Sequence, residues 1–581
     1  MRSSHILFIV VTCMLLIKFN MDLCAPVQVL AAQDNEDKDS MVITAAEIQE
    51  MQALKIADVL NNVSGLKAGD SSVSIHGSYK VKVFVDRRPI NDPTSSHSAI
   101  NWDLVDLNDV QRIEILRGKG GLTYGQDASG GVILITTKER SELSGNIKAY
   151  AGNYDTADTS ASLRKRAGLV SVGLSGGHKT SNGYKVNNDQ EHYQGSVEMQ
   201  YTWNKERLIG FSVDYLYDER GLSGYPEYPT PHSRKETRNT AYALQADAFG
   251  VHSTTHYNDG YRHNTDASKG LDKTLCVGKF GQDVTTSFQP FDLGTLNSGL
   301  GISWNQASGT SFADQDEHSA SIFASQSLSW PDWRLKLTAG LRGTYYSSFE
   351  NTLNPEIKVA YSQAPWELSA SYSRTDNVPS FYQRYNETSS TKPNPRLVLE
   401  KADNLSLTLS TTLGDGLSVS VSGFYNQLTN RITYVRDRHG LGRYQNFGDV
   451  LYTGGDVALD WTIHPMLKLK SSYTYLQVTD EETGLRLPCK PRHEAKADLY
   501  VQPTDRFSLV LNEEYTSSVY KNKSNTEKID GYFLTNIRAE YTYGDITLFT
   551  KIENLLDTKY YYVDGLLAPP LTWITGIQYV F

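Results

Sequence analysis

Three histidines are the first residues of this sequence that suggest chemistry. His252, His256 and His263 lie close together in the chain, and imidazole nitrogens are common ligands of transition metals. On a β-strand, however, residues four positions apart are separated by about 13 Å, which is too far for one shared ion. We therefore expect solvated histidines here, and the sequence predicts no metal site.

No other constellation of residues predicts catalysis. The sequence has no HExxH motif, no P-loop and no clustered CxxC motif. Of its four cysteines, only Cys276 and Cys489 lie outside the N-terminal leader described below. They could form a disulfide in an oxidising compartment or remain two separate thiols. We expect a protein that is not an enzyme and has no cofactor, and the formal net charge of −10 argues against nucleic-acid binding.

The amino terminus has the pattern of a secretory signal peptide. Arg2 supplies a positive charge, Ile6–Ile17 is apolar, and Val29-Leu30-Ala31 fits a cleavage site after Ala31. The twelve apolar residues would span only about 18 Å as a helix, which is well short of a membrane core. Residues 1–31 are therefore predicted to be a signal peptide and not a membrane anchor.

Residues 44–140 have the pattern of a compact α+β domain. Thr44 and Glu47 have the spacing of a helix capping box, and Ile56–Val63 is expected to be a second helix. Val73–Ile75 and Val81–Asp86 are expected to be strands. The domain ends in Val110–Lys138, which contains six glycines between two apolar runs, so its backbone must turn tightly. No long helix follows these glycines, which argues against a phosphate-binding loop.

From residue 143 to the end, apolar and polar residues alternate along the chain. The clearest pair of strands has Val197, Met199, Tyr201 and Trp203 on one face, followed by Phe211, Val213, Tyr215 and Tyr217. Polar residues such as Glu198 and Asp214 occupy the other face. A soluble β-sandwich would show the same alternation, but the signal peptide and the lack of a long apolar run favour a transmembrane barrel.

These motifs together resemble the TonB-dependent outer-membrane receptors. Val110–Lys138 is similar to the end of their plug domain, and the final strand alternates and ends in the aromatic residue Phe581. Further resemblances cover most of the mature chain: Val42–Ile48, Ile56–Leu66, Val73–Gly77 and Val83–Asp86 in the plug, and Val378–Tyr382, Asn394–Lys401, Gly423–Asn430 and Glu553–Tyr560 in the barrel.

The resemblance implies a membrane all-β fold, a 22-stranded antiparallel transmembrane β-barrel with an N-terminal α+β plug domain in its lumen. Residues 143–581 number 439, and this length also permits sixteen strands with longer loops, so the resemblance decides the number. It also implies the outer membrane of a Gram-negative cell, contact with membrane lipid and lipopolysaccharide, and recognition of Phe581 by the barrel-assembly machinery.

The implied function is import of a large, scarce solute such as a ferric siderophore, cobalamin or another metal chelate. TonB, working with ExbB and ExbD, would drive this import. A plugged barrel that acts as a sensor, an adhesin or a passive channel without energy coupling is the alternative. The sequence itself does not name the ligand.

The coupling segment departs from the family pattern. Family members carry a separate TonB box ahead of the plug, but only one such stretch exists here: Asp39, Ser40, Met41, Val42 and Ile43. It overlaps the first plug motif. Residues 32–43 are expected to be a periplasmic segment that contains this possible TonB box. Either the stretch serves both purposes, or the acidic tail Gln33–Asp39 couples, or coupling is lost.

Contacts between plug and barrel are a second departure. In the family, arginines that match Arg112 and Arg117 pair with barrel glutamates, and Glu400 matches one of these acids. The second acid is missing near Ser406, so another carboxylate or solvent must serve. Two plug substitutions also stand out, because His76 replaces an arginine and Arg87 occupies the place of a turn glycine.

The resemblance also places ligand-binding residues. The outward-facing plug loops would contain Tyr79, Ser95 and His97, and an outer barrel loop would contain Tyr225 and Tyr228. Aromatic and small polar side chains suit a bulky chelate, although loops of any large receptor have this composition.

Overall fold

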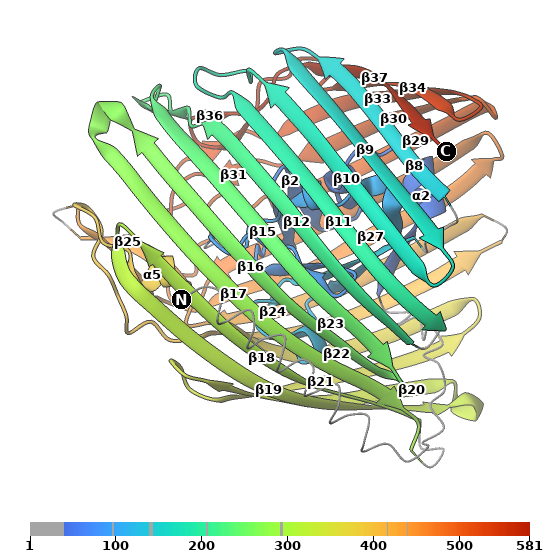
Figure 1. Cartoon of the computed structure of the whole chain (residues 1–581), viewed down its shortest axis with the longest axis horizontal. Helices are drawn as coiled ribbons and strands as arrows, with labels where there is room; N and C mark the ends of the chain where they lie inside the picture. The colour runs from blue at the N-terminus through green and yellow to red at the C-terminus, as the bar shows by residue number, and fades with distance from the viewer. Residues whose placement is uncertain are drawn as a thin grey trace.

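The structure, a computed structural model, describes residues 40–95, 98–138, 143–204, 207–290, 294–414, 416–437 and 440–581. The predicted signal peptide, Asp39 and His97 lie outside these ranges. The described chain forms a tilted barrel that surrounds a smaller N-terminal domain, drawn in blue in Figure 1. Among the described helices, none is long and apolar enough to cross a membrane.

In the described part of the chain, twenty-two antiparallel strands close into one barrel, as the resemblance implied. Strand pairing follows the chain order, and the last strand, β37, closes the barrel on the first, β8. The strands are β8 (Leu143–Gly152), β9 (Thr156–Ala167), β10 (Val170–Ser181), β11 (Gln190–Asn204), β12 (Arg207–Gly221), β15 (Ser233–Ala248), β16 (Val251–Asp266), β17 (Leu271–Phe288), β18 (Thr295–Gly309), β19 (Phe312–Trp330), β20 (Leu335–Tyr346), β21 (Thr352–Gln363), β22 (Trp366–Asn377), β23 (Glu400–Leu413), β24 (Leu417–Thr429), β27 (Val450–His464), β28 (Leu467–Asp480), β29 (His493–Thr504), β30 (Phe507–Thr516), β33 (Tyr532–Tyr543), β34 (Ile546–Glu553) and β37 (Thr572–Val580).

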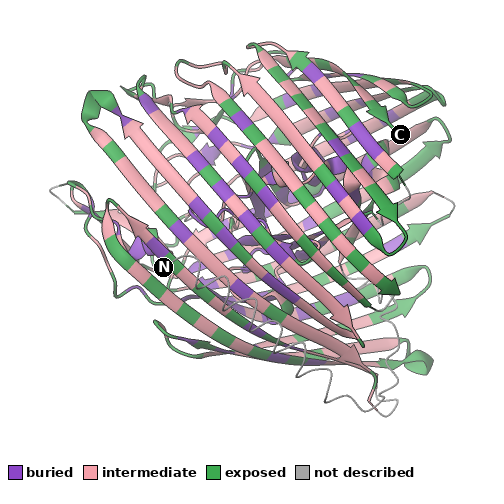
Figure 2. Ribbon diagram, in the orientation of Figure 1, coloured by how far each residue is buried: buried purple, intermediate pink, exposed green. Residues whose placement is uncertain are grey.

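The period-two pattern of the sequence sorts side chains between lipid and lumen. On β11 and β12, Met199 and Phe211 are opposite each other in the strand register and point outward, whereas Asp214 is buried against the plug. Figure 2 shows exposed and buried residues alternating along the strands. An apolar outer face and a polar lumen face are what a barrel needs in lipid.

The connections define the two ends of the barrel. Short turns such as Gly168–Leu169 alternate with longer connections such as residues 378–399. In outer-membrane barrels the short turns face the periplasm and the long loops face outward. Small elements decorate the long loops: β13 (Gly224–Tyr225), β14 (Tyr228–Pro229), α5 (Phe381–Tyr385), β25 (Ile432–Arg436), β26 (Gly442–Asn446), β31 (Val519–Tyr520), β32 (Lys528–Ile529), β35 (Tyr561–Val563) and β36 (Leu566–Leu567).

The domain inside the barrel is built on a five-stranded sheet of order β1-β6-β7-β4-β5. Its elements are β1 (Met41–Thr44), α2 (Ala45–Glu50), α3 (Ile56–Asn61), β2 (Leu66–Gly69), β3 (Ser72–Ile75), β4 (Val81–Val85), β5 (Arg88–Pro89), β6 (Val110–Arg117), α4 (Gly121–Tyr124) and β7 (Gly131–Thr137). The predicted capping box forms, since the Thr44 hydroxyl accepts from the Glu47 amide and the Glu47 carboxylate accepts from the Thr44 amide. Apolar side chains of β4, β6 and β7 form the core with α3.

The glycine-rich stretch makes tight turns. Gly120, Gly125 and Gly131 adopt φ of 98°, 79° and 136°, which residues with a Cβ rarely adopt. These turns bring β6 and β7 together as antiparallel neighbours and leave the four-residue helix α4 between them, against the barrel wall.

Candidate functional site

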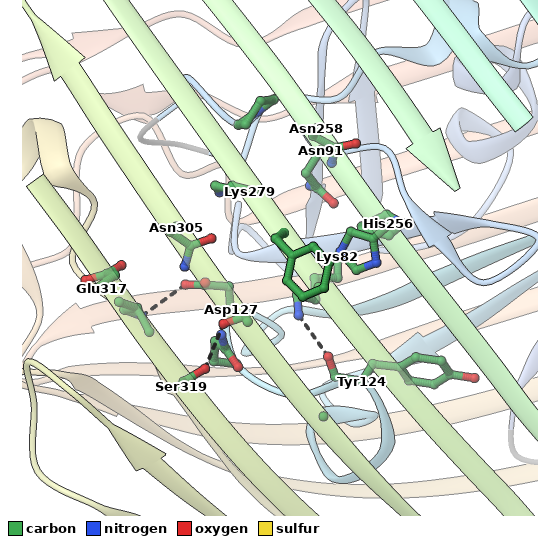
Figure 3. A pocket seen from close by; sticks show the side chains of 18 of the residues that line it. Lys82, Asn91, Tyr124, Asp127, His256, Asn258, Lys279, Asn305, Glu317 and Ser319 are labelled. Atoms are coloured by element: carbon green, nitrogen blue, oxygen red, sulfur yellow. Dashed lines mark hydrogen bonds between the residues drawn. The ribbon is translucent and has the colours of Figure 1, made fainter. Parts of the chain in front are cut away.

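A cavity of about 360 Å³ lies between the plug and the barrel wall formed by β16 to β20. The plug contributes β4 and the loops near Asp92 and Tyr124, and the barrel contributes lumen-facing residues of five strands. Figure 3 shows side chains from both domains pointing into this space. A solute that enters the barrel from outside can thus contact plug and barrel together.

The interior of the cavity is polar and carries both signs of charge. Lys82 of β4 donates a hydrogen bond to the carbonyl oxygen of Tyr124 at 2.8 Å, drawn as a dashed line in Figure 3. Burial lowers the pKa of the Lys82 ammonium to about 8, although the carboxylates of Asp127 and Asp283 oppose this shift. Lys279 and Arg342 line the same space. Arg342 donates to the carbonyl oxygen of Leu122 at 2.9 Å and to the hydroxyl of Ser321 at 2.6 Å, so Lys279 is the cation here that suits a solute rich in oxygen acceptors.

The outer rim of the cavity is aromatic. Phe349, Phe381 and Tyr382 line it next to α5, whose first turn is fixed by a capping box between Ser380 and Gln383. The guanidinium of Arg384 is paired with Glu317 and lies 4.9 Å and 5.0 Å from the ring centroids of Phe349 and Phe381. Phe381 is buried, whereas Tyr382 is 37% exposed and offers the surface of its ring to a ligand.

Of the residues predicted to bind ligand, the described structure places only Ser95 along this cavity. Tyr79 is half exposed, and its ring lies 4.6 Å from the Nζ of Lys490. Tyr225 and Tyr228 face each other on the exposed β13–β14 hairpin. Sequence reasoning missed Lys82, Lys279 and Arg342. Each is a single basic residue in a strand, and such residues form no recognisable sequence motif.

The predicted plug–barrel residues are placed as follows. Arg117 lies 3.4 Å from Asp456 of β27, and its other amino group lies 3.3 Å from the hydroxyl of Ser64. Arg112 is opposite Thr44 in the pairing of β6 with β1. Glu400 accepts hydrogen bonds from the Asn377 side chain at 3.1 Å and the Ile432 amide at 2.6 Å, both within the barrel and its loops. The carboxylate beside Arg117 is thus that of Asp456.

Helix α3 is held by barrel cations that sequence reasoning also missed. Lys551 lies 2.8 Å from the Asp58 carboxylate, and Arg538 lies 4.0 Å from it. Lys496 donates to the carbonyl oxygens of Asn61 at 2.7 Å and Leu66 at 2.9 Å, which belong to the end of α3 and the start of β2. An ammonium at a helix C-terminus also interacts favourably with the helix dipole.

The predicted coupling segment is partly built into the plug. Met41, Val42 and Ile43 form β1, which pairs with β6 and is the edge strand of the plug sheet; Ser40 precedes it. Ile43 is buried in the core. The edge of β1 opposite β6 has no strand partner among the described residues.

The histidines and cysteines have separate surroundings. His252 lies 3.1 Å from Asp247, His263 lies 2.7 Å from Asp272, and His256 lines the cavity. Within the described ranges, no group of three or more His, Cys, Asp or Glu residues could hold a metal ion. Both described cysteines, Cys276 and Cys489, are free thiols.

Comparisons with known proteins agree with this architecture. A family model for a TonB-dependent receptor-like β-barrel matches residues 101–555, and a model for the TonB-dependent receptor plug domain matches residues 33–132. The vitamin B12 transporter BtuB of Photobacterium profundum is 23% identical over 596 residues, covering 93% of this chain and 95% of the relative.

Solved structures show the same fold. The siderophore receptor PirA of Acinetobacter baumannii superimposes with a TM-score of 0.79 at 14% identity, covering 95% of this chain and all of that one. The copper transporter OprC gives a TM-score of 0.80 at 15% identity, covering 96% of this chain and all of that one.

A closed barrel of twenty-two strands that surrounds a folded plug defines the class of plugged outer-membrane receptors. The family models match most of its length, and this chain belongs to the TonB-dependent receptor family. It is an outer-membrane protein of a family of receptors and transporters.

Proposed function

We propose that this receptor imports a metal chelate, such as a ferric siderophore, cobalamin or a related complex, by TonB-driven transport. The observation that carries the proposal is the cavity between plug and barrel, with an aromatic rim outside and hydrogen-bond donors inside. Relatives named for vitamin B12, siderophores and copper support this class of solute. The same relatives favour this reading over the alternative of a sensor, adhesin or passive channel.

The proposed drive acts on residues 32–43, and Asp39, Ser40, Met41, Val42 and Ile43 form the proposed coupling segment. Because β1 is the edge strand of the plug sheet, a strand of TonB could add to its open side by β-augmentation. ExbB and ExbD would energise TonB. Ligand in the cavity can favour this engagement only through a higher affinity for the engaged state.

The domain bounds, the assembly signal and the lipid contacts complete the proposal, and they are supported by the family and by the closed barrel. In this proposal, residues 1–31 are a signal peptide, residues 44–140 are the plug and residues 143–581 are the barrel. Phe581 is the signal for the barrel-assembly machinery, and the outward-facing apolar residues contact lipid and lipopolysaccharide. The protein acts as a carrier and catalyses no reaction.

The experiment that tests the function measures uptake of radiolabelled cyanocobalamin and ferric enterobactin by cells that express this receptor alone. Uptake of at least one probe should require TonB and should fall in the variant K279A, which removes an ammonium group that lines the cavity. R166A changes an exposed arginine beside the short turn Gly168–Leu169, away from the cavity, and serves as the control. Uptake that persists without TonB would contradict energy coupling, and a K279A variant equal to R166A would contradict the cavity as the binding site.

A further inference from the structure

Four polar side chains of the barrel wall lie side by side in the cavity. In the strand register, Asn258 of β16 is opposite Lys279 of β17, which is opposite Asn305 of β18. Asn305 is in turn opposite Glu317 of β19. All four line the cavity, and Figure 3 shows them following one another across neighbouring strands. Neighbouring strands are about 4.8 Å apart, so this polar row extends over about 14 Å of the wall.

The fold itself uses only the last member of the polar row. Glu317 is paired with the guanidinium of Arg384. Among the described residues, Lys279 and Asn305 have no hydrogen-bond or ion-pair partner. Asn258 is only 4% exposed, and its Oδ1 atom is unpaired in the same part of the chain. Because buried polar groups are almost always hydrogen-bonded, the Asn258 amide calls for a partner from outside the fold.

The plug side of the cavity differs, because its polar groups are engaged within the protein. The Asn91 side chain accepts from the Val83 amide at 3.0 Å and donates to the carbonyl oxygen of Val81 at 3.0 Å. Asp127 accepts from the Lys80 ammonium at 3.3 Å. A solute in the cavity therefore finds open hydrogen-bonding groups along the polar row.

His256, two residues before Asn258, adds another open group to this wall. Its ring covers Gly281 of β17, where a Cβ would lie 2.3 Å from the ring atom Cε1, so the absence of a side chain makes room for the ring. Its Nδ1 atom is buried and has no hydrogen-bond partner among the described residues. At the same level, Ser303 and Ser319 bond each other at 2.8 Å. The imidazole nitrogen donates or accepts according to its tautomer, so it complements either polar atom of an amide.

The open groups of the polar row favour one kind of solute. Each asparagine amide presents N–H donors and a carbonyl acceptor side by side, whereas Lys279 presents donors only. A carboxamide or peptide group offers an asparagine both a donor and an acceptor, and its carbonyl oxygen can also accept from the ammonium. A polyanion that presents only acceptor oxygens would leave Oδ1 of Asn258 unpaired. A site discriminates strongly against a solute that leaves its buried polar groups unpaired.

We propose that the polar row recognises carboxamide or peptide groups, so that the receptor selects a neutral chelate rich in such groups over an acceptor-only polyanion. This inference rests on the proposed import function and names the solute class of the same cavity. Asn258 and Asn305 pair with amides of the solute, and Lys279 between them donates to a carbonyl oxygen.

Calorimetric titration of the purified full-length receptor tests the polar row with two probes. Cyanocobalamin carries carboxamide groups around its periphery, whereas ferric enterobactin is a polyanion with acceptor oxygens around its metal. The wild type should bind cyanocobalamin more tightly. N258L and N305L keep a side chain of similar size without its polar atoms, and each should weaken this binding about threefold to tenfold. K279Q removes the charge but keeps N–H donors, so it should change the affinity by less than about threefold.

The matched control is N239L. Asn239 is also 4% exposed with an unpaired Oδ1 atom among the described residues, but it lies on β15 outside the cavity lining. N239L should leave the affinity for cyanocobalamin unchanged. Because the fold offers Oδ1 of Asn258 no partner, N258L should not lower the thermal unfolding temperature. If N258L does fold poorly, N305L decides the test, since Asn305 is only half-buried.

Three results would overturn recognition of amides by the polar row. They are wild-type affinity for cyanocobalamin in N305L, an equal loss of affinity in N239L, and a loss of tenfold or more in K279Q. Binding of ferric enterobactin alone would also overturn it and would leave import of a metal chelate standing. Binding of neither probe would reject both the amide row and the proposed solute class. Uptake of cyanocobalamin that needs no TonB but falls in N305L would reject the proposed drive and support the row.

Discussion

The Asp456 carboxylate on β27 holds two plug side chains at once, with its Oδ2 atom 2.7 Å from Nε2 of His76 and 3.4 Å from Nη1 of Arg117. The His76 ring also stacks on Phe424 of the barrel at 3.7 Å. Arg117 extends the contact to the sulfur of Met41 in β1, at 3.6 Å. One barrel carboxylate thus connects the turn after β3 with the strand proposed for coupling.

Loss of the Asp456 charge should loosen the plug. D456N leaves Arg117 and His76 without their carboxylate in a buried place, which should cost about 2–4 kcal/mol of plug stability. Hydrogen exchange of the β1 and β6 amides should become faster in this variant. The matched control is D460N on the same strand, because Asp460 is 37% exposed and pairs with Lys468 and Lys470 at 3.4 Å and 3.5 Å. D460N should cost less than about 1 kcal/mol, and equal effects of the two variants would contradict the argument.

The plug should also loosen in acid through Asp58. Burial acts to raise the pKa of this carboxyl, but Lys551 and Arg538 outweigh burial and hold the pKa below its ordinary value. A lowered pKa in the folded state means that the ion pair stabilises the plug above about pH 4, and that this stability is lost as the pH falls further. Urea unfolding of the plug should show this loss in the wild type.

The matched variant for Asp58 is D58N, which cannot titrate. Its plug should be less stable than the wild type at pH 7, because Lys551 and Arg538 lose their buried partner. As the pH falls below about 4, the difference between the two proteins should shrink. A constant difference across this range would show that Asp58 does not carry the acid sensitivity.

Lys496 should stabilise the end of α3. K496M removes the donor to the carbonyl oxygens of Asn61 and Leu66, and loss of charge-assisted hydrogen bonds to a buried segment should cost about 2–3 kcal/mol. Faster hydrogen exchange in α3 and β2 would report the change. K148M is the control, since Lys148 donates one longer bond, 3.3 Å, to the carbonyl oxygen of Leu54. If K148M loosens α3 as much as K496M does, the assignment is wrong.

The barrel could be predicted from local patterns, because apolar residues that face lipid alternate with polar residues that face the lumen along each strand. The pair that contains Met199 and Phe211 has the predicted faces, and the capping box at Thr44 formed as its spacing indicated. The strand number could not be obtained from length alone. It required the resemblance, and the closed sheet confirms it.

Residues of the candidate site could be predicted from the sequence only where a residue type conflicts with the expected backbone conformation. Arg87 stood out because a glycine was expected there, and its φ of 71° explains why. Asp456 gave no signal, because its partner His76 lies 380 positions away in the chain. Such pairs depend on how the plug is rotated inside the barrel, which neither periodicity nor spacing encodes.

The seam of the barrel gives a last prediction, at Gly145. The amide of Gly145 donates to the carbonyl oxygen of Phe581 at 2.7 Å, and the Phe581 amide donates back at 3.0 Å. A Cβ on Gly145 would overlap the Phe581 ring, so only glycine allows the terminal aromatic ring to cover this position. G145V should therefore push the ring away and weaken the pairing of β37 with β8.

Heat modifiability in gel electrophoresis measures this seam, because a closed barrel resists unfolding in detergent. In protein refolded in detergent, which bypasses the assembly machinery, G145V should unfold at a lower temperature than the wild type. F581A should restore part of the loss in the double variant by removing the clash. The control is G168A, since a Cβ at Gly168 would meet nothing within 4 Å, although its φ of 62° adds a small strain of about 1 kcal/mol. Equal unfolding temperatures for G145V and G168A would mean that the close contact between Gly145 and Phe581 does not stabilise the closed barrel.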